Sequence, residues 1–417
     1  MLHVWIVILT HRNSGEKREA SSRAASGQKL LLPRPTTIQQ HTSYISKSFQ
    51  RGVVRPMSTT MNREAEYLNA LFTLTLNPIQ GDRATDLVGS LTPQEQGEFL
   101  SLADSHHVVV RGLNSLRDLA VRSGNIRLAG WASGVLEKEH KRISTALVYL
   151  QEICNELEAA SCPTTVMKSL DHYPDLGSDL DLYSTADEKS ICNVMTSKFN
   201  AHIEPRSWGD RLANKWNFAV PGLKESVEIH VQRLGQTGEH TELARRFVTR
   251  RVLKVVEEKT YNVPAPEERI VVATLQRMYR HFYFRVCDIV NSAAIVESGE
   301  LNFEELKRST EAAGIWPGIA TYLAVVSDHV KQYRGIPLAL PNFVVTAARF
   351  GGSEIKARAR FLRVPVLPHG AALYTHQVTH AAMRGDVPGT FRLGLLPYLA
   401  SAAAVAYKIT GSDKGVW

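Results

Sequence analysis

Alternating polar and apolar residues mark a strand–turn–strand unit in the middle of the chain. A short apolar run covers 164–167, turn-forming residues fill 169–177, and leucine alternates with aspartate over 178–183. Successive side chains of a β-strand point to opposite faces, so Asp179 and Asp181 are expected on one face and the leucines on the other. The pattern therefore predicts a strand that presents two carboxylates on its polar face.

A second alternating strand is predicted over 226–231, where Glu228 and His230 share the polar face. Two further runs, over 202–205 and 216–220, have the composition of strands. Together these segments predict a mixed sheet of four or five strands that is flanked by helices.

Helical spacing of apolar residues dominates the rest of the chain. Before the sheet, Thr92 is a predicted N-cap, with a proline after it and Glu95 at the third helical position. An amphipathic helix over 141–160 leads into the first strand. From residue 239 the chain is again predicted to be helical, with one continuous helix over 267–296, and no structure is assigned to most of the extension over 336–417.

The predicted fold class is therefore α+β, a small mixed β-sheet core flanked by helices, with helical regions on its N- and C-terminal sides. The expected organisation has five parts: a tail over 1–60, a helical region over 61–140, the sheet core over 141–235, a helical domain over 236–335, and a C-terminal extension over 336–417.

The polar face of the two acid-bearing strands suits a divalent cation. Asp179 and Asp181 lie about 7 Å apart along their strand, close enough to converge on one ion. Mg²⁺ prefers oxygen ligands and typically binds one or two carboxylates together with the phosphates of a substrate. Glu228 offers a third carboxylate in a matching strand. Three acids around one point would repel one another without a cation, so the site is expected to be strained when it is empty.

The same residues carry a family resemblance, through the segments Lys168-Ser169, Gly177-Ser178-Asp179-Leu180-Asp181 and Val227-Glu228-Ile229-His230. Their order is a helix, a strand and a turn, then a strand with Asp-x-Asp, then a later strand with one more acid. From residue 64 to residue 335 the chain resembles the nucleotidyltransferase fold of the DNA polymerase beta superfamily. More narrowly, it resembles the family of uncharacterised nucleotidyltransferases within it.

The resemblance implies a site and a reaction. Asp179 and Asp181 would bind two Mg²⁺ (or Mn²⁺) ions together with a nucleoside triphosphate such as ATP, and Glu228 would complete the metal site. The phosphates would be contacted by the turn residues Lys168, Ser169, Gly177 and Ser178. The implied activity is the transfer of a nucleoside monophosphate from the triphosphate to a hydroxyl group of an acceptor.

Two departures from the family pattern leave other functions open. Lys168-Ser169 replaces the usual Gly-Ser or Gly-Gly pair, and Glu228 stands where aspartate is commoner. These exchanges favour a catalytically inactive protein that keeps the nucleotidyltransferase fold for binding or regulation. A toxin-like transferase that modifies tRNA is a third alternative, disfavoured by the low charge of the core.

The predicted helix over 267–296 places His281, Arg285 and Asp288 on one face, because they follow helical steps of four and three. One interpretation is an Arg285–Asp288 ion pair within the helix, with His281 beside it. The other, which follows the family resemblance, is a face that closes over the nucleotide or the acceptor.

Charge is concentrated in the N-terminal tail. Residues 1–60 hold nine Lys and Arg and two Glu, which accounts for +7 of the net charge of +8. The folded part is therefore almost neutral and has no strong nucleic-acid-binding signature. We expect the tail to be disordered, whether it is a mis-assigned start or a targeting segment.

The remaining composition is typical of a cytoplasmic protein. The cysteines are scattered in apolar stretches without metal-site spacing, as expected of reduced core residues: Cys154, Cys162, Cys192 and Cys287. Residues 393–407 are uncharged but too few to span a bilayer, and Pro397 interrupts them, so a docked helix is expected there.

Overall fold

The computed structural model describes residues 57–358 and 360–410, all of which belong to one unit of contacts. Its first part is helical, as predicted, and its bounds are α2 (Met57–Leu76), α3 (Asp82–Ser90), α4 (Pro93–Ser105), α5 (Val109–Arg122) and α6 (Ile126–Ala159). A 3₁₀ turn, Pro78–Gln80, joins α2 to α3. The predicted tail over 1–60 lies outside the described residues except for 57–60, which form the first turn of α2.

Two N-caps set the starts of these helices. At α4 the predicted capping box is present: the Thr92 hydroxyl accepts from Glu95 N at 3.4 Å, and the Glu95 carboxylate accepts from Thr92 N at 3.0 Å. At α6 the Asn125 side chain accepts from Leu128 N at 3.1 Å. This cap lies well before residue 141, so α6 is longer than predicted.

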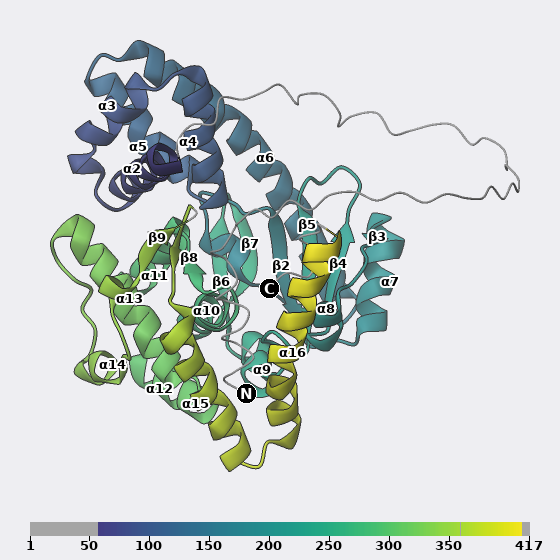
Figure 1. The fold of residues 1–417 in the computed structure, drawn as a ribbon. Helices are drawn as coiled ribbons and strands as arrows, with labels where there is room; N and C mark the ends of the chain where they lie inside the picture. The colour runs from purple at the N-terminus through teal and green to yellow at the C-terminus, as the bar shows by residue number, and fades with distance from the viewer. Residues whose placement is uncertain (1–56, 359, 411–417) are drawn as a thin grey trace, which may run out of the picture. The chain divides into compact units, whose positions relative to one another are not determined.

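The additional length lets α6 serve two parts of the chain. Its first half packs against α5, and its second half runs beside the sheet strands (Figure 1). The second half carries the predicted apolar stripe, in which Ile143, Leu147, Leu150 and Ile153 are fully or almost fully buried. This helix therefore links the N-terminal helices to the sheet.

The central sheet has five strands, within the predicted range, in the order β1-β2-β5-β4-β3. Their bounds are β1 (Thr164–Val166), β2 (Asp179–Ser184), β3 (His202–Ile203), β4 (Lys215–Ala219) and β5 (Ser226–Val231). The β2–β5 pair is parallel and the other three pairs are antiparallel, so the sheet is mixed and the predicted α+β class is confirmed. The helices α7 (Glu188–Phe199) and α8 (Trp208–Leu212) fill the connections around β3.

The helical region predicted from residue 239 onward also contains a hairpin, which was not predicted. The helix α9 (Thr241–Thr249) is followed by a hairpin of β6 (Arg251–Val256) and β7 (Lys259–Pro264). Its two turn residues, Glu257 and Glu258, have φ of 46° and 66°, as a two-residue hairpin turn requires. The β-branched residues of β6 and β7 were the sequence signal for this hairpin.

The single helix predicted over 267–296 is wrong. The chain forms α10 (Pro266–Thr274), a π-helical segment η3 (Leu275–Arg280), the short strand β8 (Tyr283–Phe284) and α11 (Val286–Glu297). The break is at Phe282, whose φ is 53°. His281 therefore precedes the break, Arg285 is the N-cap of α11 and Asp288 lies in its first turn, so they share no helical face.

The remaining elements follow α11. Their bounds are α12 (Phe303–Ala312), α13 (Trp316–Arg334), α14 (Asn342–Ala347), a 3₁₀ turn (Gly352–Glu354), β9 (Lys356–Arg358), β10 (Phe361–Arg363), a π-helical turn (Val366–Gly370), α15 (Ala371–Met383) and α16 (Val387–Thr410). A three-stranded sheet has the order β8-β10-β9. The helix α16 is docked through Arg392, which donates to Leu212 O and Thr237 O at 3.1 and 2.7 Å. Among the described residues, no helix combines the length and apolar composition needed to cross a bilayer.

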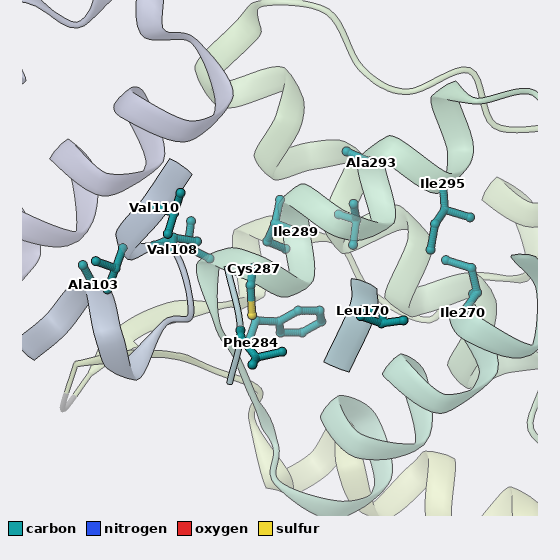
Figure 2. Close-up of a cluster of buried hydrophobic side chains, with 14 of the residues drawn as sticks. Ala103, Val108, Val110, Leu170, Ile270, Phe284, Cys287, Ile289, Ala293 and Ile295 are labelled. Atoms are coloured by element: carbon teal, nitrogen blue, oxygen red, sulfur yellow. The ribbon is translucent and has the colours of Figure 1, made fainter. Parts of the chain in front are cut away.

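Two apolar clusters hold the sheet region in place. The large one joins side chains of α4, α5, α10, β8 and α11 to Leu170, in the turn after β1 (Figure 2). A small one lies at Met167, at the end of β1, and holds Tyr183, Leu234, Phe247 and Val272. The turn between β1 and β2 is therefore anchored on two sides by apolar packing. Each of the four cysteines is free.

A buried histidine connects the N-terminal helices to the C-terminal part of the chain. His106 Nε2 donates to Arg360 O at 2.8 Å, and His106 Nδ1 accepts from Val286 N at 3.0 Å. Burial lowers the pKa of His106 from 6.5 to about 4. Between these two pH values the unfolded chain binds a proton that the folded protein does not, so stability is lost as the pH falls through this window.

We predict that His106→Asn flattens the dependence of stability on pH. In the wild type this imidazole removes about 3 kcal/mol of unfolding free energy between pH 6.5 and pH 4. Asparagine can still accept from Val286 N but does not titrate. Urea unfolding at pH 7 and pH 4.5 measures the difference, and His202→Asn, at an exposed position of β3, is the control. An equal loss of stability in both variants and the wild type would contradict the assignment.

Candidate active site

The parallel pairing of β2 with β5 brings two of the predicted acids together. Asp181 is the register partner of Glu228, although the two residues are far apart in sequence. One ligand atom from each of Asp181, Glu228 and His230 lies within 4.8 Å of the others. Within the described part of the chain, these residues form the cluster of acids and histidine that could hold a metal ion. The three side chains are nearly buried, with exposures of 13, 13 and 9%.

Two lysines neutralise these carboxylates. Lys168 Nζ lies 2.5 Å from Asp181 Oδ1, and Lys215 Nζ lies 2.9 Å from Glu228 Oε2. Lys215 also lies 3.1 Å from Asp210 Oδ1. Two ammonium groups therefore relieve the repulsion between the acids in the absence of a divalent cation. The expectation of a strained empty site, made from the sequence, did not take these two lysines into account.

The imidazole of His230 completes the environment of Glu228. Its Nε2 lies 2.8 Å from Glu228 Oε1. Burial lowers the pKa of His230 to about 4, so the ring is neutral at pH 7 and donates from Nε2. Its other nitrogen, Nδ1, is then an acceptor, and it is buried without a hydrogen-bond partner in the part of the chain that the structure describes.

The two facing carboxylates differ in acidity. Burial raises the pKa of Asp181 to about 7, against the opposing charge of Lys168. Burial also opposes ionisation of Glu228, but the hydrogen bond from His230 and the charges of Lys168 and Lys215 outweigh it and hold its pKa well below the usual value. Glu228 is therefore ionised at neutral pH, and Asp181 is the weaker acid of the two.

Asp179 lies outside this close group. It begins β2 and is exposed, and Ser178 Oγ donates to its Oδ2 at 3.4 Å. The surrounding protein partly desolvates its carboxyl, and this desolvation together with the nearby charge of Glu228 raises its pKa. The same strand thus places one acid inside the site and one at its edge.

Two of the predicted phosphate-contacting residues have structural partners. Ser169 is buried, and its hydroxyl accepts from Asp181 N at 2.8 Å and donates to Asp179 O at 3.3 Å. Gly177 lies beside the ring of His107, which is 3.6 Å from where a Cβ would be, an ordinary van der Waals distance. The two hydrogen bonds of Ser169 tie the turn to the first residues of β2, among them Asp179 and Asp181.

Lys168 lies between two small pockets. The first, about 40 Å³, is lined by apolar side chains and by the polar residues Lys168, His230, Gln236, Glu239, Gln276 and Arg280. The second, about 30 Å³, shares Lys168, Val272 and Gln276 with the first. A movement of the Lys168 side chain away from Asp181 would therefore change the shape of both pockets.

The sequence analysis did not predict a role for Asp210 or for Lys215 beside Glu228. Lys215 is the register partner of His230 on the antiparallel β4–β5 pair, so the strand pairing sets it beside Glu228. The signal available was the position of Lys215 immediately before the strand predicted over 216–220.

The donor set fits a hard divalent ion. Carboxylate oxygens are the ligands that Mg²⁺ and Mn²⁺ prefer, a neutral imidazole is more typical of softer transition-metal ions, and opposite ligands of an Mg²⁺ ion lie about 4.2 Å apart. The 4.8 Å group needs only a small contraction to surround one ion. Lys168 must leave Asp181 for such an ion to bind there.

No protein family model matches this chain, and no curated protein matches it. Among solved structures, the chain is similar to the crystal structure of an antigenic nucleotidyltransferase-like protein from Paracoccidioides brasiliensis. The two are 16% identical, the match covers 40% of this chain and 86% of that chain, and the TM-score is 0.28. A similarity at this level carries no argument about the chain.

Proposed function

We propose that this chain is a divalent-cation-dependent nucleotidyltransferase. The observation that carries the proposal is the pairing of β2 with β5, which sets Asp181 opposite Glu228 beside a lysine that borders two pockets. The reaction would join an acceptor oxygen to the α-phosphorus of a nucleoside triphosphate and break the α–β phosphate bond. Pyrophosphate and the hydroxyl proton would be released.

The roles of the side chains follow from their positions. Asp181 and Asp179 would hold the Mg²⁺ or Mn²⁺ ion, which supplies charge neutralisation for the triphosphate and the leaving pyrophosphate. Lys168, once released from Asp181, would contact the phosphates from the turn after β1. Ser178 lies at the solvent edge of the same turn, where it can donate to a phosphate oxygen.

A second candidate is a protein of this fold that binds a nucleotide without transferring it. The ion pairs of Lys168 and Lys215 favour it, because an internal cation already neutralises each facing acid. The two candidates differ in one product. Transfer releases pyrophosphate, whereas binding alone does not.

The test is incubation of the purified chain with each of the four nucleoside triphosphates and Mg²⁺ or Mn²⁺. Pyrophosphate release above the protein-free rate is expected for at least one triphosphate when a mixture of hydroxyl-bearing acceptors is present. Melting temperatures are recorded for the same mixtures, since a bound ligand stabilises the native state. A thermal shift without pyrophosphate would favour the binding protein, and neither response would contradict the proposed function.

We predict opposite effects of Lys168→Met on the two ligands. Mn²⁺ alone should bind more tightly because its competitor at Asp181 is removed, whereas the triphosphate should bind about tenfold more weakly because a charge-assisted contact is lost. Isothermal titration measures both. The control is Lys198→Met, which removes an exposed lysine paired with Glu156 on the α7 side of the sheet. Unchanged binding of both ligands would show that Lys168 serves neither.

A further inference from the structure

We infer that Lys215 is a permanent cation at Glu228 and that the site therefore binds one divalent ion, on the Asp181 side. The inference deepens the proposed function and rests on it. It replaces the two-ion arrangement implied by the family resemblance with one ion and one lysine.

Lys215 is held from both sides by carboxylates. Its ammonium group lies 3.1 Å from Asp210 Oδ1 and 2.9 Å from Glu228 Oε2, and its side chain is 11% exposed. The other oxygen of Asp210 accepts from Ser207 N and Ser207 Oγ at 2.9 and 2.7 Å, in the capping box of α8. Lys215 is thus part of strand β4, and its partner Asp210 is fixed by the capping box at the start of α8. Both ends of this ion pair are therefore held in place.

Both oxygens of Glu228 are occupied by side chains of the protein. Oε2 faces Lys215, and Oε1 accepts from His230 at 2.8 Å. A divalent ion bound to Glu228 would have to displace one of these partners inside a nearly buried site. Displacement of Lys215 would leave an ammonium group buried against Asp210 alone, which makes this replacement unfavourable.

The lysine at Asp181 is held differently. Lys168 contacts one carboxylate, comes from the 3₁₀ turn Lys168–Asp171 and borders both pockets, so it has space to turn away. Asp179, two residues earlier on the same strand, adds a second carboxylate at the edge that faces solvent. His230, whose ring also has a buried Nδ1 without a hydrogen-bond partner among the described residues, has a nitrogen within 4.8 Å of a carboxylate oxygen of Asp181. An ion on this side has to displace only Lys168, which is held by one carboxylate, whereas an ion at Glu228 has to displace Lys215 or His230.

The inference is tested with Mn²⁺ alone, by counting bound ions from the electron paramagnetic resonance signal of free Mn²⁺. The wild type is expected to bind one Mn²⁺ per chain at this site. Glu228→Gln should keep that ion, with its affinity changed by no more than about threefold, because Glu228 is not a ligand. Asp181→Asn should lose it.

Lys215 itself is examined with a matched pair of variants. Lys215→Met frees Glu228 and should raise the count to two, whereas Lys215→Arg keeps the cation and should leave the count at one. A wild type that binds two ions or none, a Lys215→Met variant that still binds one, or a Glu228→Gln variant that binds none would each overturn the inference. If Lys215→Met does not fold, the number of Mn²⁺ ions bound by Glu228→Gln tests the inference. The ion count is independent of pyrophosphate release, so failure of the inference and failure of the proposed function are read separately.

Discussion

Asp181→Asn is expected to reduce nucleotidyl transfer by about 10³-fold, the loss that follows from removing several kcal/mol of metal-assisted stabilisation of the transition state. Asp181 is the acid that the sheet places opposite Glu228, and in the proposed site it is the inner ligand of the ion. Asparagine keeps the shape of the side chain but binds Mg²⁺ weakly. Pyrophosphate release at saturating triphosphate and Mg²⁺ measures the loss.

The matched control is Asp187→Asn, in the connection that follows β2. Asp187 is exposed and caps α7 by accepting from Ser190 N at 2.9 Å, a role that asparagine fulfils equally well. Activity should be unchanged in this variant. If Asp181→Asn kept more than about a tenth of wild-type activity, the carboxylate would not be a metal ligand in the transferring enzyme.

The same variant also reports on the empty site. A site strained by repulsion would become more stable when one acid is neutralised. The 2.5 Å contact of Lys168 with Asp181 leads to the opposite expectation, since the neutral side chain leaves a poorly solvated ammonium group without its partner. A lower melting temperature of Asp181→Asn in the absence of metal is therefore expected.

The second large effect is expected for Asp288→Asn, which should lower the free energy of unfolding by about 3 kcal/mol or more. Arg277 Nε lies 2.7 Å from Asp288 Oδ2, and the exposures of the two side chains are 3 and 6%. The same oxygen accepts from Arg285 N at 2.6 Å at the start of α11. Loss of the carboxylate would leave a buried guanidinium without its counter-charge.

Urea unfolding at neutral pH measures this effect, with Asp118→Asn as the control. Asp118 pairs with Arg117 on the surface, where both side chains are more than a third exposed, so its loss should matter by less than about 0.5 kcal/mol. A fully stable Asp288→Asn protein that no longer binds a triphosphate would reverse the assignment. It would revive the interpretation in which this segment closes over the nucleotide.

Local sequence patterns determined several elements of this protein. The alternation of acids and leucines in β2, the alternation in β5 and the capping box at Thr92 all appear where they were predicted. Each depends on contacts between residues two or three positions apart, so the sequence of the segment is sufficient. The mixed sheet follows from the order of such segments, because short strands separated by helices are buried most readily in one sheet.

Long-range contacts decided what the patterns did not. The segment over 267–296 has apolar residues at helical spacing throughout, yet it is broken at Phe282. There β8 pairs with β10, and Asp288 both receives the Arg277 ion pair and caps α11. These partners lie far along the chain or on the other side of the break, and their combined stabilisation exceeds the small propensity differences that favour one helix.

The candidate site shows the same division. The residue types and spacing of Asp179, Asp181 and Glu228 could be predicted from the sequence, and so could the face of the strand that each occupies. The cations beside these acids could not be predicted from the sequence. Lys168 reaches Asp181 across a turn, and Lys215 reaches Glu228 through the pairing of β4 with β5. Ion pairs between segments depend on strand register and on burial, and both are properties of the folded chain.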